Sequence, residues 1–377
     1  MASKIRRRVK KPAKKPGKKS KHILVGTIRI KAKGLKVYEK TRTSWKLSSA
    51  QLPDAMQVVK LFKAHGKFGF LVDKKDSRFL KGQLSPEGKC QGARINILPD
   101  GRKLDKAYSL FASHLTIHDE TSNDHWDVIY HNPGGTWSYV YTLNKRRKAV
   151  NKKYKAVKEF EKRYPVLKRR VSAALRNKKD GMAVPMYTLL ETCMRVGNEI
   201  YYKAHGHKGL TTLKKRDISI KGRSVTFNYK GKDGVPRLIV HEFPATYVSR
   251  LKDMMRPLKG SSFVFTNPST GHPMRDREFK QAFKKYCGKD FYPHIVRSYY
   301  ATMEAEKFLK AHRAHKAREA SKKDMKKETL TLFKSIAEKL GHRRYIKKKH
   351  MWKENYNVTI HNYIQPDLVD KIKALAK

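Results

Sequence analysis

The sequence has few cysteines and few acidic residues. Its three cysteines are Cys90, Cys193 and Cys287, which lie far apart and form no C-x-x-C pair. This spacing argues against a disulfide framework and against a cysteine zinc site, and it fits a reducing, intracellular compartment. The 16 histidines form no H-E-x-x-H motif and no tight cluster with carboxylates, so we expect no bound metal.

Long apolar runs are also absent. No stretch approaches the roughly 18 apolar residues of a membrane-spanning helix, and no signal peptide is visible. We therefore expect no membrane-embedded segment. Hydrophobic residues still make up 39% of the 377 residues, which is enough for two domains with packed cores.

Positive charge is present in great excess. The chain has 88 lysines and arginines against 32 aspartates and glutamates, a net charge of +56. Repulsion on this scale indicates a polyanionic partner that neutralises it. Nucleic acid is the leading candidate and an anionic membrane surface the alternative. The basic patches are interleaved with tyrosine and tryptophan, which favours nucleic acid.

The first 22 residues form a basic tail. No acidic residue appears before Glu39, and Pro12, Pro16 and Gly17 oppose helix formation. Since almost nothing in this tail can be buried, we expect disorder. Such a run is typical of a nucleic-acid-binding arm or a nuclear-import signal, and a non-specific solubilising tail is the alternative.

Residues 23–144 have the pattern of a β-rich domain. Alternating apolar residues predict strands over 24–30 and 68–72, and a hairpin of 126–130 and 137–141 around Asn132-Pro133-Gly134-Gly135. Short helices are expected over 50–62 and 105–114. The aromatic and lysine side chains are candidates for DNA contact, with a place in the core as the alternative for each aromatic.

Residues 145–377 are expected to be mostly helical, so the whole chain is assigned to the α+β class. A small three-stranded antiparallel sheet is the exception. The strands are expected over 217–220, 225–229 and 237–243, and helices over 145–162, 165–175, 246–256, 275–286, 294–312 and 320–340, the last ending at Gly341.

The stretch from Pro185 to Tyr202 predicts one further helix. Arg195 lies off its apolar stripe, and Gly197 stands where glycine costs a helix about 1 kcal/mol relative to alanine. A cation beside a costly glycine suggests that a large anion approaches the backbone, whereas the alternative is an ordinary solvated arginine. The stripe is formed by Met186, Leu189, Leu190, Cys193 and Ile200.

Arg195 begins an ordered series of motifs. The later members are Gly231-Lys232-Asp233-Gly234, His294-Ile295-Val296-Arg297, Leu340-Gly341-His342 and Tyr363-Ile364-Gln365-Pro366. This order resembles that of the type IB DNA topoisomerases, particularly the small poxvirus and bacterial forms, and of the tyrosine recombinases, which share the catalytic domain. Residues 189–199 and 209–213 resemble topoisomerase segments and favour that family. The resemblance covers residues 145–377 well and the N-terminal third loosely.

The resemblance implies an enzyme that relaxes supercoiled DNA by transesterification. A tyrosine attacks a phosphodiester, a 3′-phosphotyrosine holds the strand, and the reverse step reseals it. Arg195 and Arg297 are expected to stabilise the non-bridging oxygens, and His342 to donate to one of them. Lys232 is expected to protonate the leaving 5′ oxygen, with Lys230 as its competitor.

Two further assignments carry alternatives. His294 is expected either to transfer a proton or to contact the phosphate. In the families the nucleophile follows the Gly-His pair by roughly ten residues, where this chain has Met351 and Trp352. Tyr363 is nevertheless favoured, because Val358 through Pro366 matches the bacterial pattern. Tyr356 is the second candidate and Tyr345 a distant third.

The resemblance also implies a clamp around double-stranded DNA. The clamp would combine a DNA-binding domain, residues 23–144, with a catalytic domain, residues 145–377. Neither ATP, a metal nor a small-molecule cofactor is expected, and the protein should act as a monomer in a nucleus, virion or nucleoid. The alternatives are a tyrosine recombinase and a non-catalytic DNA-binding protein of chromatin or virions.

Overall fold

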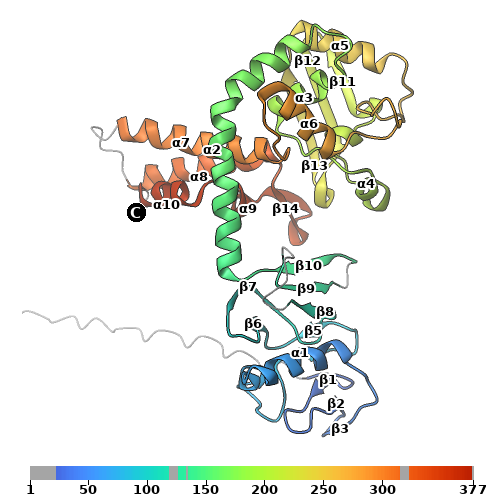
Figure 1. The fold of residues 1–377 in the computed structure, drawn as a ribbon, viewed down its shortest axis with the longest axis vertical. Coiled ribbons are helices and arrows are strands. Elements are labelled where there is room, and N and C mark those ends of the chain that lie inside the picture. The colour runs from blue at the N-terminus through green and yellow to red at the C-terminus, as the bar shows by residue number, and fades with distance from the viewer. Residues whose placement is uncertain (1–22, 119–125, 133–134, 315–321, 376–377) are drawn as a thin grey trace, which may run out of the picture. The chain divides into compact units, whose positions relative to one another are not determined.

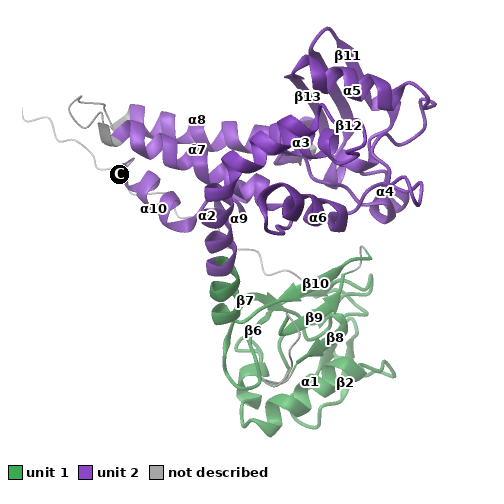
Figure 2. Ribbon diagram, turned by 45° about the horizontal axis from the view of Figure 1, so that its top comes forward, with its two compact units in different colours: residues 1–150 green, residues 151–377 purple. Residues whose placement is uncertain are grey.

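Helix α2, Leu143–Ala174, passes through the point at which the chain divides into two compact units (Figure 2). The units are residues 1–150 and 151–377. The computed structural model describes residues 23–118, 126–132, 135–314 and 322–375. The basic tail, for which disorder was predicted, lies outside the described residues. The boundary predicted near residue 145 falls inside α2.

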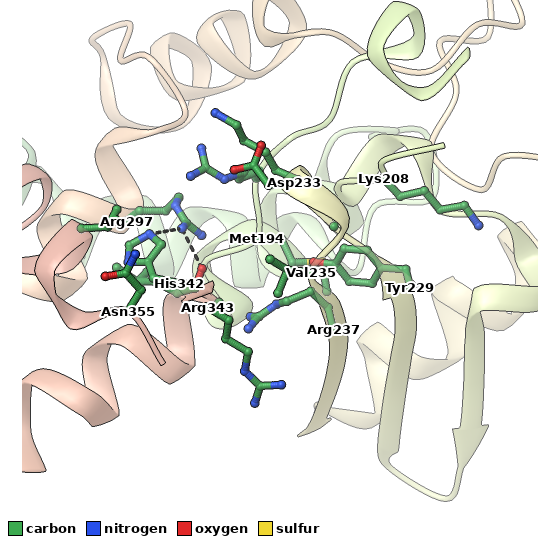
Figure 3. Close-up of a pocket in the computed structure, with 16 residues that line it drawn as sticks. Met194, Lys208, Tyr229, Asp233, Val235, Arg237, Arg297, His342, Arg343 and Asn355 are labelled. Atoms are coloured by element: carbon green, nitrogen blue, oxygen red, sulfur yellow. Dashed lines mark hydrogen bonds between the residues drawn. The ribbon is translucent and has the colours of Figure 1, made fainter. Parts of the chain in front are cut away.

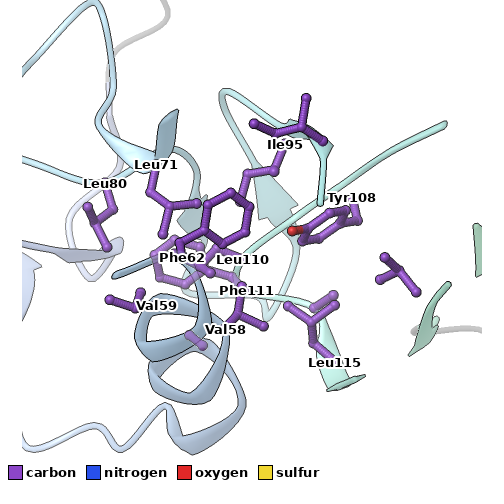
Figure 4. Close-up of a cluster of buried hydrophobic side chains, with 14 of the residues drawn as sticks. Val58, Val59, Phe62, Leu71, Leu80, Ile95, Tyr108, Leu110, Phe111 and Leu115 are labelled. Carbon is purple, nitrogen blue, oxygen red and sulfur yellow. The ribbon is translucent and has the colours of Figure 1, made fainter. Parts of the chain in front are cut away.

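The described residues of the first unit form short antiparallel strands that pack with helix α1, Pro53–Ala64 (Figure 1). Helix α1 begins with a proline, which suits the first turn of a helix. It buries Val58, Val59 and Phe62 in one hydrophobic cluster with the strands around it (Figure 4). The strands are β1 Ile28–Ile30, β2 Val37–Lys40, β3 Trp45–Leu47, β4 Gln83–Leu84, β5 Cys90–Gln91, β6 Ile95–Ile97, β7 Lys103–Tyr108, β8 Ser113–Ile117, β9 Val128–His131 and β10 Trp137–Val140.

Two predictions for this unit are confirmed. Helix α1 covers most of the helix expected over 50–62. Strands β9 and β10 form the expected antiparallel hairpin, with Trp137 opposite His131. Residues 133–134 of its turn lie outside the described residues.

Two other predictions for this unit are wrong. Residues 68–71 form a 3-10 helix instead of a strand, because Phe70 N–H bonds locally to Lys67 C=O at 3.0 Å. Residues 105–114 belong to strands β7 and β8 instead of a helix. The turn between the strands is closed by a bond from Ala112 N–H to Ser109 C=O, and the spacing of the apolar residues there only resembles that of a helix.

Helix α2 is one continuous helix and not the two helices expected over 145–162 and 165–175. The proline removes one backbone donor but does not end the helix, because buried residues on both sides hold it to its neighbours. Phe160 before the proline packs edge to face with Phe283 and Phe291. Val171 after the proline is fully buried.

The remaining elements of the second unit match most predictions. The antiparallel sheet β11–β12–β13 is confirmed, and Tyr229 lies opposite Arg237 in it. Helices α7 and α8 lie side by side, with α9 and α10 against them (Figures 1 and 2). The bounds are β11 Ile218–Lys221, β12 Ser224–Lys230, β13 Pro236–Glu242, α5 Ala245–Met255, α6 Asp276–Cys287, α7 Ile295–Ala314, α8 Lys322–Leu340, β14 Arg343–Ile346, β15 Met351–Glu354, α9 Tyr356–Asn362 and α10 Pro366–Leu375.

Candidate active site

Arg195 lies in a loop between two helices, so the prediction of one helix over 185–202 is wrong. Helix α3, Ala183–Thr192, ends where Cys193 adopts a left-handed conformation with φ 54°. Helix α4, Glu199–His205, starts anew after Asn198, whose side chain accepts the N–H of Ile200 at 2.8 Å. Ile200, expected on the buried stripe, is 76% exposed.

Gly197 in this loop is required by a contact inside the protein. Its φ is +102°, and a Cβ there would lie 3.2 Å from the Cα of Gly209 and 2.9 Å from the Thr212 hydroxyl. Two backbone bonds fix the same contact, since Leu210 N–H donates to Arg195 C=O at 2.8 Å and Thr211 N–H to Val196 C=O at 2.7 Å. The glycine therefore accommodates the 209–212 segment, and the anion suggested by the sequence is not needed to explain it.

Tyr363 follows the last residue of α9, and its side chain is 4% exposed. Its hydroxyl lies 3.0 Å from Nη2 of Arg195 and 2.8 Å from Nε2 of His294. A guanidinium can only donate, so the tyrosine oxygen accepts from Arg195. The tyrosine proton is then available to His294.

His294 is held in its neutral form. Burial and then the charges of Arg297 and Arg195 lower the pKa of His294 from 6.5 to about 3. A neutral imidazole can accept at Nε2, which is the role left open by the bond from Arg195 to the tyrosine oxygen. The site therefore holds the nucleophile candidate between one fixed donor and one acceptor.

Arg297 is buried at the centre of the site, with 2% of its surface exposed. It donates from Nη1 to Cys193 C=O at 2.6 Å and from Nη2 to Leu340 C=O at 2.8 Å. Its guanidinium carbon lies 5.3 Å from the centre of the Tyr363 ring. Burial lowers the pKa of Arg297, yet an arginine remains charged. The end of α3 and the end of α8 thus orient this cation together.

His342 joins Arg297 to helix α9. Its Nε2 lies 3.1 Å from Nη2 of Arg297, and its Nδ1 lies 2.8 Å from the hydroxyl of Thr359. Because Arg297 has no acceptor, Nε2 must accept, which leaves the proton on Nδ1. Burial, Arg297 and Arg195 lower the pKa of His342 from 6.5 to about 2, in agreement with a neutral ring.

Lys232 lies in the turn between β12 and β13, and its side chain is exposed. The turn is closed by a bond from Gly231 N–H to Val235 C=O at 2.7 Å. Lys232 lines a pocket of about 210 Å³ together with Arg195, Arg297 and His342 (Figure 3). Lys230, its competitor, ends β12 with an exposed side chain.

The segment between His342 and α9 explains the unusual spacing to the tyrosine. Residues 343–354 form a two-stranded hairpin of β14 and β15, which the sequence did not predict as strands. Asn355 N–H then donates to His342 C=O at 2.6 Å, so the chain returns to the site after the hairpin. Tyr345 lies on this hairpin and is 45% exposed, and Tyr356 is the first residue of α9.

Two further residues that support the site were missed by the sequence reasoning. Thr359 is fully buried one helical turn before Tyr363, a spacing that is a usable signal. Arg237 donates to the carbonyls of Glu338 and Lys339 at 3.0 and 2.9 Å, which ties β13 to the end of α8. Arg237 carries no comparable signal, because its partners are backbone atoms remote in sequence.

The described residues contain no group of three or more histidines, cysteines and carboxylates placed to hold a metal ion. Among the same residues, no helix is both long and apolar enough to cross a membrane.

Comparison with known proteins assigns the chain to a family. The family model of the eukaryotic DNA topoisomerase I catalytic core matches residues 143–366, which is more than half of the chain. The chain belongs to this family. The topoisomerase match includes Arg195, Lys232, Arg297, His342 and Tyr363, and the predicted resemblance is confirmed at the level of the family.

Two individual proteins are also similar to this chain. A DNA topoisomerase 1B of Acanthamoeba polyphaga mimivirus is 24% identical over 227 residues, which are 57% of this chain and 66% of that protein. A crystal structure of the XerH site-specific recombinase bound to difH substrate, a pre-cleavage complex, is 14% identical and covers 55% of this chain and 50% of that one. The TM-score between the two structures is 0.29.

Proposed function

We propose that this protein is a type IB DNA topoisomerase that relaxes supercoiled DNA through a transient 3′-phosphotyrosyl break in one strand. The observation that carries the proposal is the Tyr363 hydroxyl, which lies within hydrogen-bond distance of both Arg195 and His294. A hydroxyl is a weak nucleophile until an adjacent base takes its proton, and His294 is within reach of the proton of Tyr363.

In the proposed cleavage step, the Tyr363 oxygen forms a bond to phosphorus while the bond to the 5′ oxygen breaks. The tyrosine proton passes to Nε2 of His294, 2.8 Å away. Phosphate charge in the occupied site raises the pKa of His294 toward its ordinary value, which makes the ring a better proton acceptor.

The phosphoryl oxygens gain negative charge in the transition state, and we assign their stabilisation to Arg195 and Arg297. Fixed cationic donors in a water-poor site are an effective means of such stabilisation. His342 orients Arg297 in the free protein, since its Nε2 accepts from that guanidinium. An entering phosphate raises the pKa of His342 as well, so that the ring can then donate to a non-bridging oxygen.

We assign Lys232 as the general acid. Its ammonium group gives a proton to the departing 5′ oxygen, which becomes a hydroxyl. In religation the neutral amine takes that proton back as the 5′ oxygen attacks phosphorus. The bond from phosphorus to the tyrosine oxygen breaks, and His294 returns its proton to that oxygen. The energy of the broken bond is kept in the phosphotyrosine, so the cycle needs no ATP.

Double-stranded DNA is the proposed partner, and the net charge of +56 supports it. We assign DNA binding to the β-rich N-terminal domain, residues 23–144, and catalysis to residues 145–377, and we propose that the two domains clamp the duplex. We also propose that the protein acts as a monomer, in a nucleus, a virion or a nucleoid.

Plasmid relaxation in EDTA without ATP tests this function. The protein should remove positive and negative supercoils as a monomer and without a partner site. Denaturation during the reaction should trap a covalent adduct at the 3′ phosphate, which peptide mapping should locate on Tyr363. A requirement for ATP or magnesium, or attachment at a 5′ phosphate, would overturn the proposal, and dependence on paired sites would indicate a recombinase.

A further inference from the structure

Two consecutive side chains of helix α2 donate hydrogen bonds to the backbone on both sides of Tyr363. The ammonium group of Lys153 donates to the carbonyl of Asn362, and the hydroxyl of Tyr154 donates to the carbonyl of Ile364 at 2.6 Å. The sequence positions of the donors and acceptors differ by 209 and 210 residues. The two bonds therefore span the tyrosine from one fixed helix.

The backbone at Tyr363 needs such support, because regular structure stops there. Helix α9 has seven residues and ends at Asn362, and Tyr363 has non-helical angles of φ −130° and ψ −31°. The last carbonyls of a helix lack partners within the helix, and a lysine near a helix C-terminus is a favourable partner for them. Lys153 supplies this partner for Asn362.

The anchor on α2 is itself well packed. Tyr154 is 7% exposed, and Val157 and Phe160 on the same face of α2 are buried among the neighbouring helices. The ammonium group of Lys153 lies 5.4 Å from the centre of the Tyr363 ring. Lys153 is thus close to the reacting side chain, while its hydrogen bond reaches the backbone beside it.

We infer that Lys153 and Tyr154 are positioning residues, which hold the Tyr363 backbone so that the hydroxyl stays between Arg195 and His294. This inference rests on the proposed function, because it concerns the same nucleophile. It makes these two residues of α2 a support for the backbone that carries the nucleophile. Since α2 begins in the first compact unit at Leu143, the helix also links that unit covalently to the nucleophile's support.

Single-turnover cleavage at saturating DNA tests the inference with full-length protein. Tyr154→Phe removes one hydroxyl without changing charge, and Lys153→Met removes the other donor. We expect each to slow cleavage by about 10-fold to 100-fold with an unchanged Kd for DNA, since small misplacements of reacting groups have costs of that order. Lys153→Arg should recover part of the rate. Lys155→Met, an exposed lysine on α2, is the matched control and should be normal.

Amide hydrogen exchange gives a second readout that needs no activity. Peptides covering residues 356–366 should exchange faster in Tyr154→Phe and Lys153→Met, whereas peptides from the β11–β13 sheet should not change. Unchanged exchange at 356–366, or a normal saturated rate with weaker DNA binding, would overturn the inference. If the wild-type protein forms no adduct, the proposed function fails, and the exchange data still decide whether α2 holds Tyr363.

Discussion

Nη2 of Arg195 lies 3.0 Å from the hydroxyl of Tyr363, although 168 positions separate the two residues in the sequence. The distance is that of a hydrogen bond, and the cation is the one expected to act on the scissile phosphate. The nucleophile candidate and its electrostatic partner are therefore adjacent within the fold itself. In the proposed reaction, the scissile phosphate has to lie beside these two groups.

The choice of nucleophile is tested by two tyrosine substitutions. Tyr363→Phe removes the attacking oxygen and should abolish the covalent adduct while DNA binding persists. Tyr356→Phe, the matched control at the start of α9, should form the adduct at a rate close to that of the wild type. Denaturing gels after reaction with end-labelled DNA measure both. Adduct formed by Tyr363→Phe but not by Tyr356→Phe would transfer the role to Tyr356.

The role of Lys232 is tested with a modified leaving group. Lys232→Ala should slow cleavage of ordinary DNA by about 10²-fold or more, because the 5′ oxygen then leaves without a proton. On DNA in which sulfur replaces the bridging 5′ oxygen, the variant should regain most of its rate, since a thiolate needs little protonation. Lys230→Ala should be close to normal on both substrates.

The arginines provide the contrast for this experiment. Arg195→Ala and Arg297→Ala should stay slow on the sulfur substrate, because the non-bridging oxygens that they are proposed to stabilise are unchanged. Rescue of an arginine variant without rescue of Lys232→Ala would reverse the assignment of roles.

Thr359 should control the orientation of His342. Thr359→Val keeps the shape of the side chain but removes the oxygen that lies 2.8 Å from Nδ1. The imidazole then loses a fixed partner, and we expect single-turnover cleavage to fall by about 10-fold or more, as for other losses of positioning near a reacting centre. Thr331→Val, at an exposed position on α8, is the control. A normal rate in Thr359→Val would show that Arg297 alone fixes the ring.

Stability should fall in mild acid because of the two buried histidines. Burial, with Arg297 and Arg195, lowers the pKa of His342 to about 2 and that of His294 to about 3. Below about pH 6.5 the unfolded chain binds protons that the folded chain does not, so the free energy of unfolding decreases as pH falls. The slope from one such histidine is at most about 1.4 kcal/mol per pH unit.

Denaturant unfolding at about pH 7, 6 and 5 measures this effect in the wild type and in His342→Gln. The substitution should flatten the loss of stability between about pH 6 and 5 by roughly 1 kcal/mol. His350→Gln, at an exposed position, is the control and should keep the wild-type slope. Equal slopes in wild type and His342→Gln would mean that the ring is protonated in the folded protein.

The contact behind the Arg195 loop is tested by Gly209→Ala. A Cβ at Gly209 would lie 2.6 Å from the carbonyl oxygen of Arg195, so the loop or the 209–212 segment must move. We expect a loss of about 1–3 kcal/mol in the free energy of unfolding and slower cleavage. Gly181→Ala, where no atom lies within 4 Å of the added carbon, should change neither quantity appreciably.

The pattern of apolar and polar residues along the chain was sufficient to predict one sheet and several helices. The β11–β13 sheet and helices α1, α5, α6, α7 and α8 were predicted close to their observed positions, because alternation and helical spacing reflect which face is buried. The order of the site residues was readable from short motifs. These motifs are sufficient to indicate the family.

Local pattern failed where remote contacts overrule it. The apolar spacing of 185–202 continues past Cys193, yet the helix stops there, and the Cys193 carbonyl accepts a bond from Arg297. The periodicity of apolar residues contains no information about Arg297, which lies 104 residues away from Cys193 in the sequence. In α2 the error was the opposite one, because packing on both sides outweighs the cost of Pro165.

The sequence by itself determined the class of the fold, the basic character of the protein and the set of residues available for chemistry. Only the tertiary structure decided how those residues meet: which tyrosine reaches Arg195 and His294, which nitrogen of His342 accepts from Arg297, and which helix donates hydrogen bonds to the backbone beside Tyr363. The physical reason is that charge and periodicity are properties of short stretches. Hydrogen bonds such as that from Tyr154 to Ile364 C=O depend on the packing of elements far apart in the chain.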